Sequence, residues 1–178
     1  MAFTISEFRG KALNNAGARA NLFDVTMIGA SAAGLNASEF TFACKAAAIP
    51  AMAVGVVEVP YFGRVVKVPG NKTFDNWNVT IINDEGFTIR NGMEKWIATM
   101  GTHIGNVNTA TNENLYGQGV VKQYAKTAGA SIATYSFVNI FPVNMSEITL
   151  GWDANDAIEE FTVEFAYDYW THTGVVTK

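Results

Sequence analysis

The stretch FTVEFAYDY, residues 161–169, alternates large apolar side chains with smaller or polar ones. Successive side chains of a β-strand point to opposite faces, so this period of two predicts a strand with one buried face. The apolar face would consist of Phe161, Val163, Phe165, Tyr167 and Tyr169. This is the clearest strand pattern in the chain, and it favours a mainly β fold.

Similar patterns occur on both sides of this stretch. In residues 73–82, Trp77, Val79 and Ile81 share one face, and in residues 39–46, Phe40, Phe42 and Cys44 share another. We expect seven to nine strands in total, and residues 1–20 should be irregular or extended. Cys44, the one cysteine, is most simply a small buried apolar side chain. The further predicted strands cover residues 21–28, 64–68, 120–126, 130–141 and 147–153.

One helix is predicted, over residues 84–101. Asn83 or Asp84 can cap its start, and Gly101 can end it. Its apolar side chains recur at helical spacing, and Arg90 and Glu94 form an i, i+4 pair on the other side. The apolar stripe is Ile89, Met93, Trp96, Ile97 and Met100. At 178 residues the chain should form a single domain, a β-sandwich or barrel with one helix packed outside.

Residues 47–70 are unusually apolar for a connection between strands. The segment holds three prolines and three glycines, and its first half carries almost no charge. Two interpretations remain open: a loop packed on its own domain, or an arm that packs on a partner.

Composition leaves a similar choice. Charged residues make up 16% of the chain, against about 25% in average soluble proteins, while there are 12 Phe, 6 Tyr and 4 Trp. A well-packed β domain and a protomer that buries much of its surface in an assembly both have this composition. Residues 127–177 contain seven acidic residues and no Lys or Arg. This disfavours nucleic-acid binding; the acidic surface is solvated, contacts basic surfaces of neighbouring copies, or repels a polyanion.

Catalytic and metal-binding patterns are weak. His103 and His172 have no other ligand at metal-site spacing, and no nucleophile or phosphate-loop motif is present. Asp75, two residues from Trp77, is either a base with a raised pKa or, more often in such positions, an acceptor that closes a turn. We therefore expect no enzyme activity, no catalytic residues, no metal and no cofactor. No apolar run is long enough for a membrane span and no signal peptide is evident, which predicts cytoplasmic synthesis.

Five segments in order resemble the tail tube proteins of T4-like contractile phages: NLFDV, FTFACKAAAIP, NKTFDNWNVTIINDE, VVKQYAK and SEITLGWDANDAIEEFTVEFAYDYW. The resemblance spans residues 19–170. Residues 29–38, residues 101–118 and the chain after Trp170 depart from it. The positions that carry the family pattern are Phe42, Lys45, Pro50, Phe74, Asp75, Trp77, Asp84, Trp152, Asp153, Asp168, Tyr169 and Trp170.

The resemblance implies hexameric rings that stack into a tube, with strands of all copies forming one inner β-barrel. It also implies a virion protein assembled in the bacterial cytoplasm, with sheath, baseplate and tail terminator proteins as partners and DNA passing through the lumen without specific binding. An injection- or secretion-system inner tube is the alternative. A soluble β-barrel ligand-binding module is a rival from another class.

Within the predicted single domain, residues 1–178, we expect an N-terminal arm at 1–20, the helix at 84–101 and a C-terminal tail at 171–178. The resemblance implies that the apolar connection at 47–70 is a loop between rings. The candidate residues for contacts between rings are Ala51, Met52, Val54, Val56, Tyr61, Phe62 and Arg64.

Overall fold

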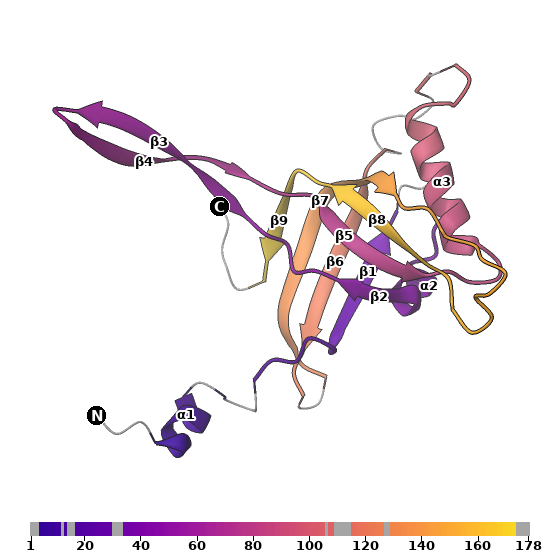
Figure 1. The fold of residues 1–178 in the computed structure, drawn as a ribbon, viewed down its shortest axis with the longest axis horizontal. Helices are drawn as coiled ribbons and strands as arrows, with labels where there is room; N and C mark the ends of the chain where they lie inside the picture. Colours follow the sequence, from indigo (N-terminus) through magenta and orange to yellow (C-terminus); the bar gives the residue numbers. More distant parts are fainter. Residues whose placement is uncertain are drawn as a thin grey trace.

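The computed structural model describes residues 4–11, 13, 17–29, 34–105, 107–108, 115–126 and 129–173. Antiparallel strands make up the largest share of these residues and helices a much smaller one, which confirms the mainly β prediction (Figure 1). Seven strands form one sheet with the order β1-β6-β7-β8-β5-β2, in which β9 also pairs with β7, and β3 and β4 form a separate ribbon. The strands are β1 Phe23–Ile28, β2 Cys44–Ala47, β3 Ala53–Tyr61, β4 Arg64–Thr73, β5 Trp77–Ile82, β6 Gly117–Tyr124, β7 Ser131–Met145, β8 Glu160–Ala166 and β9 Tyr169–His172.

Strand β7 joins two layers of the sheet. Its first part pairs with β6 and β9, and its last part pairs with β8. Between these parts Asn139 adopts a left-handed conformation with φ of 55°, which Asn tolerates better than most residues. The Asn139 Nδ2 donates a hydrogen bond of 2.6 Å to Asp168 Oδ2. Asp168 also donates its backbone N–H to Val138 O, so this residue fixes the bend of β7.

The core lies between the two layers. Trp77 of β5 stacks against Phe137 of β7, with ring centroids 4.5 Å apart, and lies 5.8 Å from the ring of Phe165 on β8. Phe161, Val163 and Phe165 are buried, as the alternation in residues 161–169 predicts. The single strand predicted for residues 161–169 is nevertheless two strands. Tyr167 and Asp168 interrupt it, and β9, which follows them, pairs with β7.

Helix α3, Thr88–Met100, covers one side of the sheet (Figure 1). Ile89, Met93 and Trp96 are buried, as predicted, and Arg90 Nε lies 3.2 Å from Glu94 Oε1. The helix begins four residues later than predicted, because Asp84 to Phe87 form a turn in which Phe87 donates its N–H to Asp84 O. The N-cap residue is therefore Phe87, not the predicted Asn83 or Asp84, although the Asp84 carboxylate still accepts the N–H of Thr88 at 3.1 Å.

Three sequence predictions about local structure are wrong. Residues 39–46 are not a strand but helix α2, Ala37–Ala43, followed by β2, so Phe40 is buried while Phe42 is exposed. Within residues 1–20, Ile5–Lys11 form helix α1. Residues 147–153 form no strand. Residues 174–178 of the predicted tail, and parts of the segments 1–20, 29–38 and 101–118, lie outside the described residues.

Cys44 packs against the core but is half-buried, so the predicted burial of this side chain is only partial. Burial, reinforced by the Asp24 carboxylate, raises the pKa of this thiol to about 12. Since the thiolate is the reactive form, we expect labelling by a disulfide reagent at pH 8 to be on the order of a hundredfold slower than for a free cysteine. Urea should remove this protection. A labelling rate in the native protein equal to that of the unfolded chain would contradict the burial of this thiol.

Candidate assembly surfaces

The β3–β4 hairpin projects from the body as a ribbon of two strands (Figure 1). Its pairing runs from Ala53 opposite Thr73 to Tyr61 opposite Arg64. Every residue of the two strands is exposed except Gly70, which is half-buried. The predicted loop over residues 47–70 is therefore a hairpin, and the predicted short strand at 64–68 is part of the longer β4. An isolated ribbon of two strands is only marginally stable in water, so this one is suited to packing on another surface.

Apolar side chains lie on both faces of the hairpin. Val56 and Val57 are consecutive in β3, and Val65 and Val66 are consecutive in β4; neighbouring residues in a strand point to opposite faces. A strand that alternates apolar and polar residues would cover one surface, whereas this ribbon can bury both faces. The exposed apolar side chains of the hairpin are Val54, Val56, Val57, Val59, Tyr61, Phe62, Val65, Val66 and Val68.

The tip of the hairpin is a two-residue turn, Phe62-Gly63, with φ of 43° and 76°. Positive φ at both positions matches the twist of a hairpin, but Asn, Asp or Gly normally occupies the first position. A bulky residue there is strained. Phe62 is 91% exposed, and its ring contacts that of Tyr61 at 4.7 Å. Phe62 thus combines a strained backbone with an exposed aromatic ring and contributes little to the stability of its own fold. This indicates that its ring contacts another molecule.

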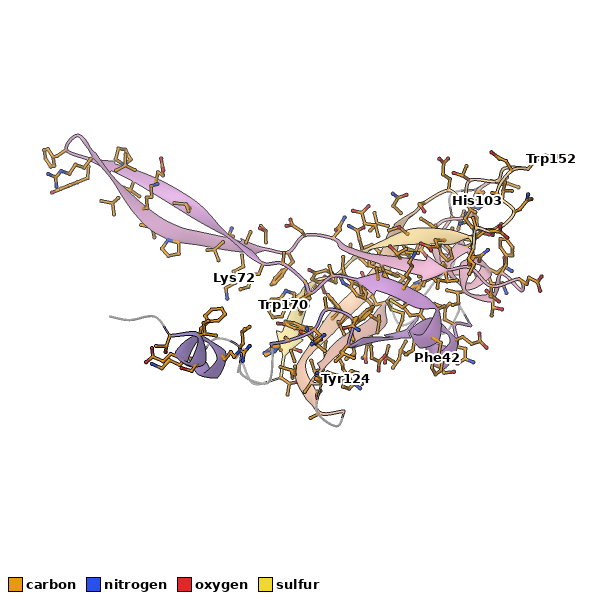
Figure 2. All side chains as sticks on the ribbon, turned by 60° about the horizontal axis from the view of Figure 1, so that its bottom comes forward. Phe42, Lys72, His103, Tyr124, Trp152 and Trp170 are labelled. Atoms are coloured by element: carbon orange, nitrogen blue, oxygen red, sulfur yellow. The ribbon has the colours of Figure 1, made fainter. Side chains whose placement is uncertain are left out.

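Aromatic residues of the predicted family pattern hold the root of the hairpin. Trp77 Nε1 donates to Ala48 O at 2.7 Å, and Trp170 Nε1 donates to Ala51 O at 3.3 Å. The ring of Phe74 lies 6.4 Å from that of Trp170 (labelled in Figure 2). Pro50 is buried at the same root. These contacts fix where the ribbon leaves the body.

Asp75 lies beside this root and is exposed. Within the described chain its carboxylate accepts no hydrogen bond, so the prediction that it closes a turn in this way is wrong. It does act electrostatically on Tyr167: burial of the hydroxyl, and then the Asp75 carboxylate, raise the pKa of Tyr167. Among the described residues, the Tyr167 hydroxyl has no hydrogen-bond partner.

The candidate residues for contacts between rings lie along the hairpin. Ala51 and Met52 precede β3, Val54, Val56 and Tyr61 lie in it, Phe62 lies at the turn, and Arg64 begins β4; all are exposed. The sequence prediction missed Val57, Val59, Val65, Val66 and Val68, which extend this surface. The feature of the sequence that could have identified these residues is the pair of short valine-rich segments on either side of Phe62-Gly63.

The end of the molecule opposite the hairpin is acidic and also exposes apolar groups. Figure 1 places α2, the beginning of α3 and the segment 146–159 together there, and Figure 2 labels Phe42 and Trp152 at the same end. Phe42 is 88% exposed and Trp152 is fully exposed. Asn83 ties the segment to the start of α3, because its N–H and its Nδ2 donate to O and Oε2 of Glu159. Asp153 of the family pattern is exposed in this segment, and Lys45 pairs with Glu160 beside it.

Several strand edges are unpaired. Within the described chain β1 pairs only with β6, β9 only with β7, and β2 only with β5. Open edges expose backbone donors and acceptors, which natural proteins usually cover or use. On the outward face of the layer β1-β6-β7-β9, Thr26, Val120, Ser136 and Thr171 stand opposite one another in register. The charged residues Asp24 and Lys122 form one facing pair on the same layer.

Nothing in the described residues forms a metal-binding group of three or more His, Cys, Asp or Glu side chains. No described helix is long and apolar enough to cross a membrane. The candidate functional regions of this molecule are three surfaces: the hairpin, the acidic end and the open strand edges.

Comparison with known proteins identifies the family of this chain. Residues 18–173 match the family of phage tail tube proteins. The chain is 37% identical over 154 residues to the tail tube protein gp19 of Enterobacteria phage T4, covering 86% of this chain and 90% of that protein. The tail tube proteins that this chain resembles are structural proteins and not enzymes.

Solved structures share the fold at low identity. A chain from the tube-terminating cap of the anti-feeding prophage gives a TM-score of 0.65 at 15% identity, covering 88% of this chain and 90% of that one. A chain from the sheath-tube complex of an extracellular contractile injection system in its extended state gives 0.58 at 14% identity, covering 98% and 100%. The family match and the identity to a curated tail tube protein together establish the assignment: the chain belongs to the phage tail tube protein family.

Proposed function

We propose that six copies of this chain form a ring and that the rings stack into the inner tube of a contractile phage tail, through which DNA leaves the virion. The observation that carries this proposal is the β3–β4 hairpin, which exposes apolar side chains on both faces and buries none of them in its own chain. Membership of the tail tube family supports the same function. Apolar patches of this kind mark interaction sites.

Ring closure would use the open edges of β1 and β9. Pairing of β1 of one copy with β9 of the next would continue the layer β1-β6-β7-β9 around the ring and satisfy both edges. The outward face of that layer would then line the lumen. Its aligned Thr26, Ser136 and Thr171 are uncharged, and Asp24 faces Lys122. A lumen without excess positive charge would let DNA pass without binding it.

Stacking would use the hairpin. Apolar surface contributes about 25 cal/mol per Å² when buried, so an area on the order of several hundred Å² per copy could hold rings together after the costs of association. The contact joins different surfaces of the two copies, and such heterologous contacts propagate instead of closing. Sheath, baseplate and tail terminator proteins would be the further partners, since similar chains occur in structures of a sheath-tube complex, a baseplate and a terminator. Assembly would take place in the bacterial cytoplasm, and the product would be part of the virion.

The inner tube of a contractile injection system is the second candidate, because solved structures from such systems share the fold over most of the chain. The same surfaces serve both functions, and the cargo differs. A soluble ligand-binding barrel has little support, since Trp77, Phe137 and Phe165 fill the space between the layers where a ligand would lie.

Negative-stain microscopy of the purified chain over a range of concentrations tests the proposal. We expect rings about one subunit high and, at high concentration, tubes of constant diameter with a stain-filled lumen. A monomer under all conditions, especially one that co-purifies with a small apolar molecule, would contradict the proposal and favour the ligand-binding barrel.

A further inference from the structure

A groove at the acidic end offers a place for the hairpin tip of another copy. The groove has a volume of about 460 Å³ and lies between α2, the end of β5 and the beginning of α3. Ala43, Ile82 and Ile89 form apolar walls, and the exposed ring of Phe42 extends from its border. Its lining residues are Glu39, Phe42, Ala43, Ile82, Asn83, Asp84, Thr88 and Ile89.

The hairpin tip has the matching chemistry. Phe62 and Tyr61 present two exposed aromatic rings at the end of a narrow ribbon. Phe62 has a backbone φ of 43°, and its ring contacts that of Tyr61 while 91% of the residue stays exposed. An apolar groove with an exposed aromatic residue at its border would remove both rings from water.

Charges at the two surfaces are complementary. Arg64 follows the turn directly, whereas Glu39 and Asp84 lie in the groove. In the described part of the chain, none of these three residues has a partner of opposite charge within salt-bridge distance. Glu39 accepts a hydrogen bond from Asn36 and Asp84 accepts two from Thr88, so both carboxylates are held in place by neutral donors. Opposite charges arranged in this way favour a specific orientation of two partners.

The tip and the groove lie at opposite ends of the longest axis of the molecule (Figures 1 and 2). A copy cannot place its own tip in its own groove without detaching the hairpin root from Trp77 and Trp170. The occupant must therefore come from another chain. Contact between opposite ends of identical molecules is heterologous and can propagate without limit.

We propose that the hairpin tip of each copy, Tyr61 to Arg64, docks into the α2–α3 groove of a copy in the next ring, with Phe62 against Phe42 and Arg64 facing Glu39 and Asp84. This rests on the proposed stacking of rings and adds the surface that receives the hairpin. It makes Phe42, which exposes most of its ring, part of the tube interface.

Disulfide cross-linking tests the contact directly. In a Cys44→Ala background, the double variant Phe62→Cys, Phe42→Cys is assembled and then oxidised. We expect a ladder of covalent products on a non-reducing gel that extends beyond six subunits, since links between rings run along the tube. Each single variant should give at most dimers. A ladder that ends at six would place the contact within one ring and overturn the proposal.

Helix α1 is the rival occupant, because Ile5 and Phe8 are also exposed apolar residues. A double variant Phe8→Cys, Phe42→Cys in the same background therefore serves as the comparison. Efficient cross-linking of this pair, with none for Phe62→Cys, would assign the groove to α1 and overturn the proposal. Labelling of each introduced thiol in the unassembled protein verifies that it is accessible.

A charge exchange gives an independent readout. Arg64→Glu should reduce tube yield at least about tenfold, and adding Glu39→Arg should restore much of the loss. Lys95→Glu, on the exposed side of α3, is the matched control and should leave tube yield unchanged. Failure of Glu39→Arg to restore Arg64→Glu, while wild-type tubes form normally, contradicts the docking site but not the stacking function. Absence of rings and tubes from the wild type contradicts both.

Discussion

Removal of residues 56–69 is expected to abolish tube formation and leave the domain folded. Gly55 and Gly70 are adjacent across the ribbon, since a Cβ on Gly70 would lie 3.1 Å from Gly55 O. Joining them leaves a Gly-Gly turn, which suits a short hairpin. The removed residues are exposed, so we expect the free energy of unfolding to change by less than about 1 kcal/mol. Circular dichroism with urea titration measures the fold, and negative-stain microscopy measures assembly.

The control for this deletion is the full-length variant Lys126→Glu, which keeps the hairpin and changes one surface residue elsewhere. That variant should form tubes at the yield of the wild type. If the deleted chain assembles into tubes of normal length and yield, the hairpin is not the stacking element. Unfolding of the domain by the deletion would mean that the hairpin stabilises the core. That result would contradict the exposure of the hairpin in the structure.

Replacement of Trp77 by Ala is expected to have the largest effect on folding. Trp77 is 2% exposed, contacts Phe137 and Phe165, and donates a hydrogen bond to Ala48 O. Loss of a buried Trp typically costs about 3–5 kcal/mol, a large share of the roughly 5–15 kcal/mol that stabilises a domain. Because the same side chain holds the hairpin root, folding and tube assembly should fail together. Urea titration and microscopy of one preparation measure both.

Trp152→Ala is the matched control for this substitution, since Trp152 is fully exposed in the segment 146–159. Its free energy of unfolding should remain within about 0.5 kcal/mol of the wild type. An equal loss of stability in the two variants would mean that burial does not determine the effect. A Trp77→Ala chain as stable as the wild type would show that the aromatic stack is not the centre of the core.

The parts of the fold that follow local periodicity could be predicted from the sequence. Phe161, Val163 and Phe165 on β8, and Trp77, Val79 and Ile81 on β5, are buried as their alternation indicates. In the predicted stripe of α3, Ile89, Met93 and Trp96 are buried, whereas Ile97 and Met100 are half-buried. In these elements one face meets the core along the whole segment, so the pattern and the tertiary structure agree.

Helix α2 could not be identified from alternation alone. Residues 39–46 read as a strand, but the Asn36 carboxamide accepts the N–H of Ser38 and donates to Glu39, which favours a helix start. In the resulting helix, residues two apart lie on nearly opposite sides, so Phe40 is buried and Phe42 is exposed. The exposed Phe42 is the residue that the strand interpretation would have placed in the core.

Two further differences could not be predicted from local periodicity. The split between β8 and β9 occurs where Asp168 meets Asn139, a contact that neither segment reveals alone. The apolar composition of residues 47–70 left open whether they pack on their own domain or on a partner, and the turn of the hairpin, Phe62-Gly63, lacks the usual Asn or Asp at the first position. Unusual residues are retained where a surface has a function, and here the departure from turn chemistry points to the tip that we propose as a contact between rings.

Cryo-electron microscopy of the assembled wild-type chain tests the central claim most directly. We expect rings of six copies with a continuous inner barrel, stacked so that density for each β3–β4 hairpin crosses into the next ring and is buried there on both faces. Assemblies in which the hairpins extend into solvent, or in which adjacent copies share no pairing between strand edges, would contradict it.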